Sequence, residues 1–141
     1  MASVAYNQVA DEFLVSESAS AKSHQMYQAI DLVHLSHQSL GDRALERELL
    51  MLFNRQAQQI VELLHASVAE KDCKTKTMFN LAHTLKGSAL AIGARRVAKA
   101  AEALEAATGI QIGAEPLKAR VAEIDNAVDE AGRAVAGMLL G

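Results

Sequence analysis

Residues 79–93 read Phe-Asn-Leu-Ala-His-Thr-Leu-Lys-Gly-Ser-Ala-Leu-Ala-Ile-Gly. The apolar residues of this stretch recur at helical spacing, which predicts a helix with one buried row. The opposite face carries His83, followed three and four positions later by Lys86 and Gly87, so the imidazole is predicted to point outward. The buried row consists of Met78, Ala82, Leu85, Ala89 and Ile92.

Gly87 lies in the middle of this predicted helix, where a glycine costs about 1 kcal/mol relative to alanine. A glycine at such a position calls for a reason, and the close approach of another surface is the simplest one. The ammonium group of Lys86 lies one helical turn from His83 on the same face. We therefore predict that a partner approaches the ring of His83 beside a positive charge.

The run His-Thr-Leu-Lys-Gly-Ser-Ala at 83–89, with Gly93 ten residues after the histidine, resembles the signature of histidine phosphotransfer (HPt) domains. These domains belong to bacterial multistep two-component phosphorelays, and the resemblance spans residues 30–139. It implies that His83 accepts a phosphoryl group, that Lys86 stabilises the phosphoryl charge and that Gly87 leaves steric access. It also implies contacts with the partner through Thr84, Ser88, Arg95 and Arg96.

The resemblance implies partners and cofactors as well. Phosphate would arrive from the phosphoaspartate of one receiver domain and leave to the aspartate of another, in response regulators and in a hybrid histidine kinase. The Mg²⁺ that such transfers use would be held by the receiver, so this chain itself is expected to need no cofactor. His34 and His37 are spaced i, i+3, but no acidic or sulfur ligand is matched to them, and we predict no metal site.

A histidine side chain suits a phosphoryl carrier because the imidazole is mostly neutral at pH 7 and keeps a lone pair on one ring nitrogen. No Asp or Glu occupies the sequence or helical neighbours of His83, at positions 79, 80, 82, 84, 86 and 87. We therefore predict no carboxylate close enough to activate water against a phosphohistidine. No nucleotide-binding motif is present either, so the chain is expected to carry phosphate without kinase activity of its own.

Two other classes of protein stay open at this point. One is a non-catalytic helical adaptor that binds receiver domains without accepting phosphate, although such a protein would be expected to have lost His83. The other is a structural or membrane-surface helical protein. That class does not explain why Gly87 follows an outward histidine by one helical turn.

Composition and charge limit the remaining possibilities. The net charge of −3 argues against nucleic acid or an anionic membrane as the main partner. Residues 71–99 are basic, with seven Lys and Arg against Asp72 alone, so an acidic partner surface is predicted. Cys73 is the only cysteine, and no apolar run reaches the length of a membrane span. We expect a monomeric, cytoplasmic protein.

The 141 residues are half apolar with one proline, which predicts an all-α domain. We expect an N-terminal extension at 1–29, either a short helix or a flexible arm. At 30–141 we expect an antiparallel up-down four-helix bundle with additional short N-terminal helices. The core is predicted to include Ile30, Val33, Leu40 and the methionines at 26, 51, 78 and 138. The predicted helices cover residues 28–39, 43–69, a segment that Gly93 either ends or kinks, residues 94–108, and a last helix with Pro116 in its first turn.

Overall fold

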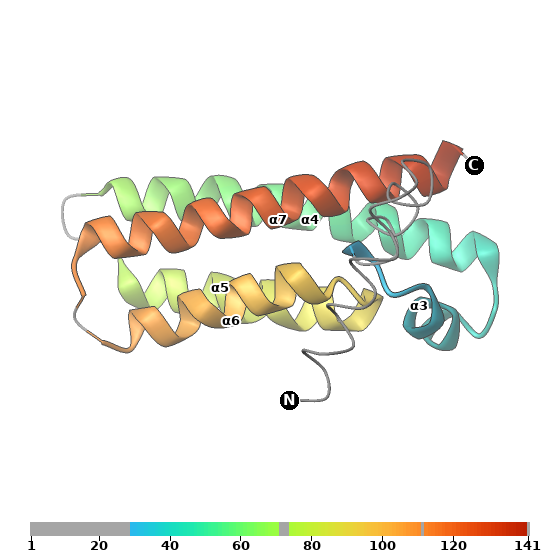
Figure 1. The fold of residues 1–141 in the computed structure, drawn as a ribbon, viewed down its shortest axis with the longest axis horizontal. Helices are drawn as coiled ribbons and strands as arrows, with labels where there is room; N and C mark the ends of the chain where they lie inside the picture. Colours follow the sequence, from blue (N-terminus) through green and yellow to red (C-terminus); the bar gives the residue numbers. More distant parts are fainter. Residues whose placement is uncertain (1–28, 71–73, 111, 141) are drawn as a thin grey trace, which may run out of the picture.

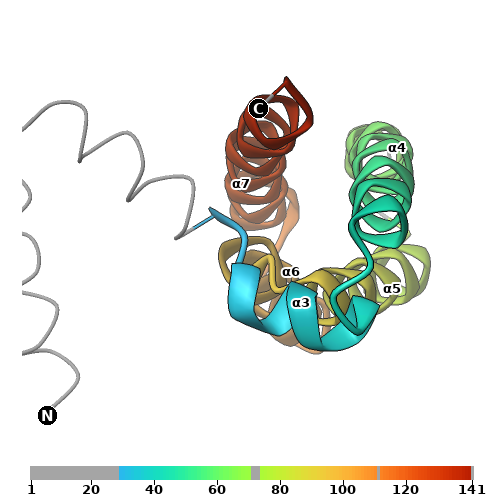
Figure 2. The ribbon, with the colours of Figure 1, turned by 90° about the vertical axis from the view of Figure 1, so that its right-hand side faces the viewer.

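The computed structural model describes residues 29–70, 74–110 and 112–140, and all regular structure in these segments is helical. In the bundle, α4 packs against α5 and α7, and α6 completes the ring by packing against the same two helices (Figure 1). α3 lies across one end (Figure 2). The predicted all-α bundle with an added short helix is confirmed, whereas residues 1–28 lie outside the described segments. The helices are α3 (Leu32–Ser39), α4 (Arg43–Ala69), α5 (Thr75–Ile92), α6 (Arg95–Thr108) and α7 (Ala114–Leu140).

Asp42 and Gly93 cap two of the helices of the bundle, whereas α5 and α6 begin without a side-chain cap. The carboxylate of Asp42 accepts hydrogen bonds from the backbone N–H groups of Ala44 and Leu45 at the start of α4. Gly93 ends α5 in the left-handed conformation, with φ 79°. Gly109 follows α6, and its φ of −79° is right-handed, so this position does not require glycine for its conformation.

The predicted helix at 28–39 is shorter than expected. It begins at Leu32 because the side chain of Asp31 accepts a hydrogen bond from the N–H of His34, at 3.1 Å, and so caps it. Ile30 is buried as predicted, but Val33 and Leu40 are 71% and 93% exposed, so their assignment to the core is wrong. α3 covers the end of the bundle with one face only. Val33 lies on another face of this helix, and Leu40 follows its last residue as the C-cap.

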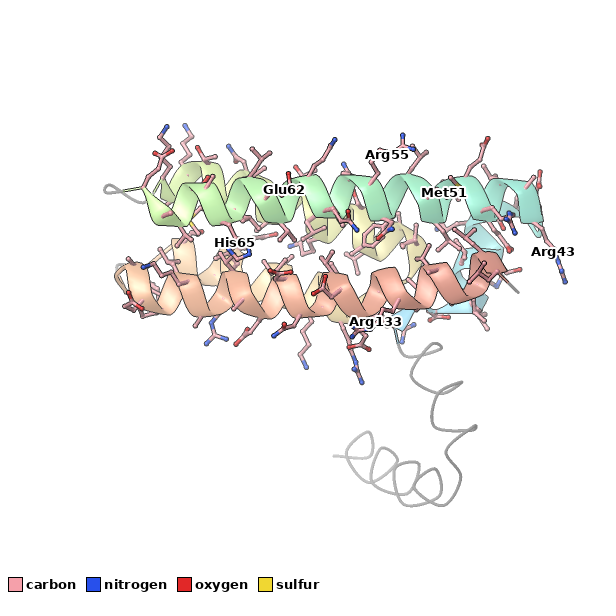
Figure 3. The ribbon with its side chains drawn as sticks, turned by 90° about the horizontal axis from the view of Figure 1, so that it is seen from above. Arg43, Met51, Arg55, Glu62, His65 and Arg133 are labelled. Carbon is pink, nitrogen blue, oxygen red and sulfur yellow. The ribbon has the colours of Figure 1, made fainter. Side chains whose placement is uncertain are left out.

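The core otherwise follows the helical stripes. All five residues of the predicted buried row on α5 are buried, as is Met78 among the methionines. Met138 is partly buried, and Met26 lies outside the described residues. Met51 is a further error, because it is 49% exposed and lies one turn before Arg55 on the outward side of α4 (Figure 3).

The turn between α5 and α6 is fixed to α3 at Gly93. The N–H of Asp31 donates to the carbonyl of Gly93 at 2.9 Å, and the Asp31 carboxylate pairs with Arg95 at 2.6 Å. A Cβ at position 93 would lie 2.8 Å from the Cβ and 2.9 Å from the carbonyl oxygen of Asp31. Glycine is therefore needed at this position both for its positive φ and for the close approach of α3.

We predict that Gly93→Ala lowers the free energy of unfolding by roughly 2–4 kcal/mol, from left-handed strain plus overpacking against Asp31. Gly41→Ala is the matched control, because Gly41 has φ 80° and nothing within 4 Å of an added Cβ. That control should lose only about 1 kcal/mol, from backbone strain. Urea unfolding followed by circular dichroism measures both, and equal losses would show that the contact with Asp31 does not matter.

A second prediction concerns the charge of Asp31. The hydrogen bond from the N–H of His34 lowers the pKa of this carboxyl, partial burial opposes that change, and Arg95 lowers the pKa further. A carboxyl with a lowered pKa in the folded state stabilises the fold above its unfolded pKa, and this contribution is lost as the pH falls through the folded value. Asp31→Asn keeps a capping side chain without the charge. The stability difference between wild type and Asp31→Asn should therefore shrink as the pH is lowered from about 6 to about 3.

Candidate functional site

His83 lies in the middle of α5 on the face opposite the buried row. Its side chain is 64% exposed, as the outward orientation predicted from the sequence requires. The ring of Phe79, one turn earlier, stacks on the imidazole with the centroids 6.0 Å apart and the planes 9° apart. The imidazole is thus accessible to a partner, and Phe79 supports one of its faces.

A carboxylate from the next helix reaches His83. Glu105 of α6 places Oε1 3.3 Å from Nδ1 of His83 and 3.2 Å from Nζ of Lys86, and its Oε2 accepts a hydrogen bond from the same Nζ. The prediction that no carboxylate lies near His83 is therefore wrong. It considered the neighbours on one helix, whereas Glu105 comes from the antiparallel helix packed beside α5.

The sequence does contain a signal that Glu105 faces a neighbouring helix. This residue directly follows the buried Leu104 and lies four positions after the buried Ala101, at the edge of the apolar stripe of α6. A charged residue at the edge of a stripe faces a neighbouring helix, and α5 is joined to α6 by a very short turn. Glu105 is only 13% exposed, so its charge depends on the ammonium group of Lys86 and on the polar ring of His83, both from α5.

The Oε1 atom of Glu105 is buried and, among the described residues, accepts no hydrogen bond of standard geometry despite its two short contacts. It therefore retains acceptor capacity directly beside Nδ1 of His83. A carboxylate there favours the tautomer that carries its proton on Nδ1. The lone pair is then on Nε2, the other ring nitrogen.

Gly87 and its neighbours form the other side of the site. An added Cβ at Gly87 would meet nothing within 4 Å, so packing within the chain does not explain this glycine. Thr84 is exposed. Ser88 is half-buried, and its hydroxyl donates to Oε1 of Gln56 on α4 at 2.7 Å, which ties α5 to α4.

The two arginines predicted to contact a partner form ion pairs with acidic residues of this chain. Arg95 pairs with Asp31, and Arg96 reaches Glu130 of α7 with Nη1 2.8 Å from Oε1. With Glu105 beside Lys86 and Glu70 beside Lys74, four acidic residues from outside the segment 71–99 balance part of its positive charge. The basic zone of the sequence is therefore less basic in space than along the chain.

Residues 29–70, 74–110 and 112–140 contain neither a candidate metal site nor a candidate membrane-spanning helix. No three His, Cys, Asp or Glu side chains come together there in a group able to hold a metal ion. None of the helices in these segments is both long and apolar enough to cross a bilayer.

The family model of the Hpt domain matches residues 48–134, more than half of the chain. The chain belongs to the Hpt domain family. The matched region contains His83, Lys86, Gly87 and Glu105, and the resemblance predicted from the sequence is confirmed. Membership in the Hpt family assigns the chain a role in histidine phosphotransfer.

The Hpt assignment agrees with a comparison of folds. The structure is similar to that of a rice protein assigned as a histidine-containing phosphotransfer protein, with a TM-score of 0.66 over 92% of this chain and 91% of the other. At 16% identity this similarity shows a common fold. A search of curated protein sequences finds no match to the chain.

Proposed function

We propose that this Hpt protein is a phosphorelay intermediate in which His83 accepts a phosphoryl group from the phosphoaspartate of one receiver domain and passes it to the aspartate of another. The observation that carries the proposal is the contact of Glu105 with Nδ1 on an exposed histidine. It leaves Nε2 as the nucleophilic nitrogen and directs it away from the carboxylate.

In the proposed step, the Nε2 lone pair attacks the phosphorus of an aspartyl phosphate. The N–P bond forms as the P–O bond to the aspartyl oxygen breaks, and the aspartate leaves as a carboxylate. The proton stays on Nδ1, so the phosphorylated ring carries a positive charge that Glu105, 3.3 Å away, offsets. The reverse sequence of bond changes delivers the group to the next receiver.

In this proposal, Lys86 neutralises negative charge on the phosphoryl oxygens. Its ammonium group is held by Glu105 in the present structure, and its side chain is 25% exposed. Phosphoryl transfer depends mainly on positioning and on neutralising charge at the equatorial oxygens, and a lysine one turn from His83 meets both needs. Glu105 thus acts as a positioning residue for the two groups that act on phosphate.

The same proposal covers partners, cofactor and location. The receivers would belong to response regulators and to a hybrid histidine kinase, and they would supply the Mg²⁺. The Hpt chain would act as a monomeric phosphate carrier without kinase activity, in the cytoplasm, where a single unpaired cysteine is unexceptional.

The proposal is tested by incubating the purified chain with a panel of phosphorylated receiver domains in Mg²⁺. The expected product is a chain that carries acid-labile, alkali-stable phosphate, with a ³¹P resonance typical of Nε2-phosphohistidine. Subsequent addition of an unphosphorylated receiver should discharge it. A folded chain that binds receivers without becoming labelled would indicate the inert adaptor instead.

A third prediction concerns Glu105. Glu105→Ala should slow labelling from the receiver about tenfold, because a charge-assisted contact of about 1.4 kcal/mol with the ring is lost. Glu105→Gln keeps an acceptor oxygen without the charge and should fall between this variant and the wild type. The second readout is the ring itself: in ¹⁵N spectra of the unphosphorylated protein, the fraction of the tautomer protonated at Nδ1 should fall in Glu105→Ala. An unchanged tautomer ratio together with unchanged labelling would refute the positioning role.

A further inference from the structure

We infer that Phe79 is a positioning residue: its aromatic ring fixes the plane of the His83 imidazole and stabilises the positive charge that this imidazole carries after phosphorylation. The inference rests on the proposed function, because the charge arises only if Nε2 of His83 accepts a phosphoryl group. Phe79 would then set how much phosphate the chain holds relative to its receiver.

The packing of the bundle does not account for Phe79. It is the largest apolar side chain of α5, yet it is 41% exposed. It belongs neither to the buried core nor to the partly buried side chains that pack against the core. An aromatic ring left this exposed forgoes part of the stabilisation that burial provides. The contact with His83 therefore offers a reason for a phenylalanine at this position that the fold does not.

Phe79, His83 and Gly87 form one row along the surface of α5, at spacings of four residues. Side chains of an α-helix lean toward its N-terminus, so the imidazole leans toward Phe79 and away from Gly87. The two rings are 9° from parallel with their centroids 6.0 Å apart, which is an offset stack. One face of the imidazole is thus turned toward an aromatic ring, whereas the other looks over a residue without a side chain.

The stack and the contact with Glu105 constrain the imidazole in different ways. Oε1 of Glu105 lies 3.3 Å from Nδ1 of His83 and holds one edge of the ring. This single contact leaves the ring free to turn about it, whereas stacking on Phe79 fixes the plane of the ring. The lone pair of Nε2 lies in that plane, so the covered face does not obstruct attack on phosphorus. Together the two contacts fix the direction of the lone pair, and orientation of this kind accelerates transfer.

Phosphoryl transfer changes the charge of the ring. Nε2 forms the N–P bond as the P–O bond to the aspartyl oxygen breaks, and Nδ1 keeps its proton, so the neutral imidazole becomes a cation. A cation within about 6 Å of an aromatic centroid is attracted by the negative face of that ring. The centroids of Phe79 and His83 are 6.0 Å apart. Phe79 therefore stabilises the phosphorylated protein more than the unphosphorylated one.

The inference is tested by measuring phosphoryl transfer in both directions between the chain and one receiver domain in Mg²⁺. The ratio of the two rate constants is the equilibrium constant for placing phosphate on His83. A contact made only in the docked complex changes both rate constants by the same factor and cancels in this ratio. The equilibrium constant therefore reports the phosphorylated ring, and not how the receiver docks.

The variants separate an aromatic contact from an apolar one. Phe79→Leu keeps an apolar side chain without an aromatic face, whereas Phe79→Tyr and Phe79→Trp keep the face. Leu90→Ala is the matched control, because Leu90 is a second exposed apolar side chain of α5, 52% exposed and seven residues after His83 on the same side of the helix. Circular dichroism checks that each variant is folded.

We expect Phe79→Leu to lower the equilibrium constant about two- to fivefold, which is the range of a cation–π contact at an exposed site. Phe79→Tyr and Phe79→Trp should hold it at the wild-type value or above, and Leu90→Ala should leave it unchanged. An equilibrium constant in Phe79→Leu equal to that of the wild type would overturn the inference. So would a loss in Phe79→Leu that Phe79→Tyr and Phe79→Trp share.

The stack itself is measured by ¹H NMR of the unphosphorylated protein. The ring current of Phe79 should displace at least one carbon-bound ring proton of His83 in the wild type relative to Phe79→Leu. Equal shifts in the two proteins would refute the inference while the relay function stands. Phosphoramidate, a small phosphoryl donor that needs no docking, tests the function separately. If neither phosphoramidate nor any receiver labels the wild type at His83, the proposed function fails, and the inference fails with it.

Discussion

His83→Gln is expected to abolish phosphoryl acceptance from receivers and from phosphoramidate while leaving the fold intact. Glutamine fills a similar volume at a site that is 64% exposed, so unfolding by urea should change by less than about 0.5 kcal/mol. An amide nitrogen has no lone pair available for attack on phosphorus, so no rate should remain. Phosphate on the intact protein, measured by mass spectrometry under alkaline conditions, reports the result.

The chain provides a histidine control for this experiment. His65 of α4 is 49% exposed and pairs with Asp125 of α7 at 2.9 Å (Figure 3). Its contact with a carboxylate resembles that of His83, but no lysine contact to Asp125 accompanies it within the described residues. His65→Gln should retain full labelling. Labelling of His83→Gln at the wild-type rate, or its loss in His65→Gln, would place the phosphoryl group on another residue.

The fold was predictable to the extent that it depends on residues close together in sequence. The boundaries of α4 follow from Asp42 and from the turn after residue 69, and the end of α5 follows from Gly93. The buried row of α5 is specified by apolar spacing alone. These features depend on capping and periodicity, which act over one or two helical turns.

The remaining features depend on tertiary packing. Glu105 lies 22 residues after His83 and becomes its neighbour only because α5 and α6 pack antiparallel. The ion pairs of Arg95 and Arg96 likewise join α6 to segments far along the chain. Val33 is apolar, as core residues are, but it lies on a helix that covers only the end of the bundle. Charge and apolarity were visible in the sequence, whereas the neighbour that each side chain would meet was not.

Gly87→Leu should make the protein more stable and nevertheless stop its exchange with receivers. A Cβ at this position meets nothing within 4 Å, so the isolated chain accommodates the larger side chain. Replacing a mid-helix glycine by leucine should raise the free energy of unfolding by up to about 1 kcal/mol. The same side chain projects from the surface one turn after His83, where it holds the donor away from Nε2, and a displacement of about 1 Å can cost a hundredfold in rate.

The combination of these effects separates a docking role from a structural one. Gly87→Leu should lose at least about a hundredfold in transfer from a phosphorylated receiver, while phosphoramidate, which needs only the exposed ring, should label it at nearly the wild-type rate. Gly87→Ala is the graded control, with the same gain in stability and a smaller loss of transfer. Unchanged transfer in Gly87→Leu would show that no partner approaches α5 at this position. If the glycine only gives a docked partner access to the ring, added bulk should slow transfer from the receiver and leave labelling by phosphoramidate unchanged. Loss of both reactions would instead indicate that Gly87 affects the reactivity of His83 itself.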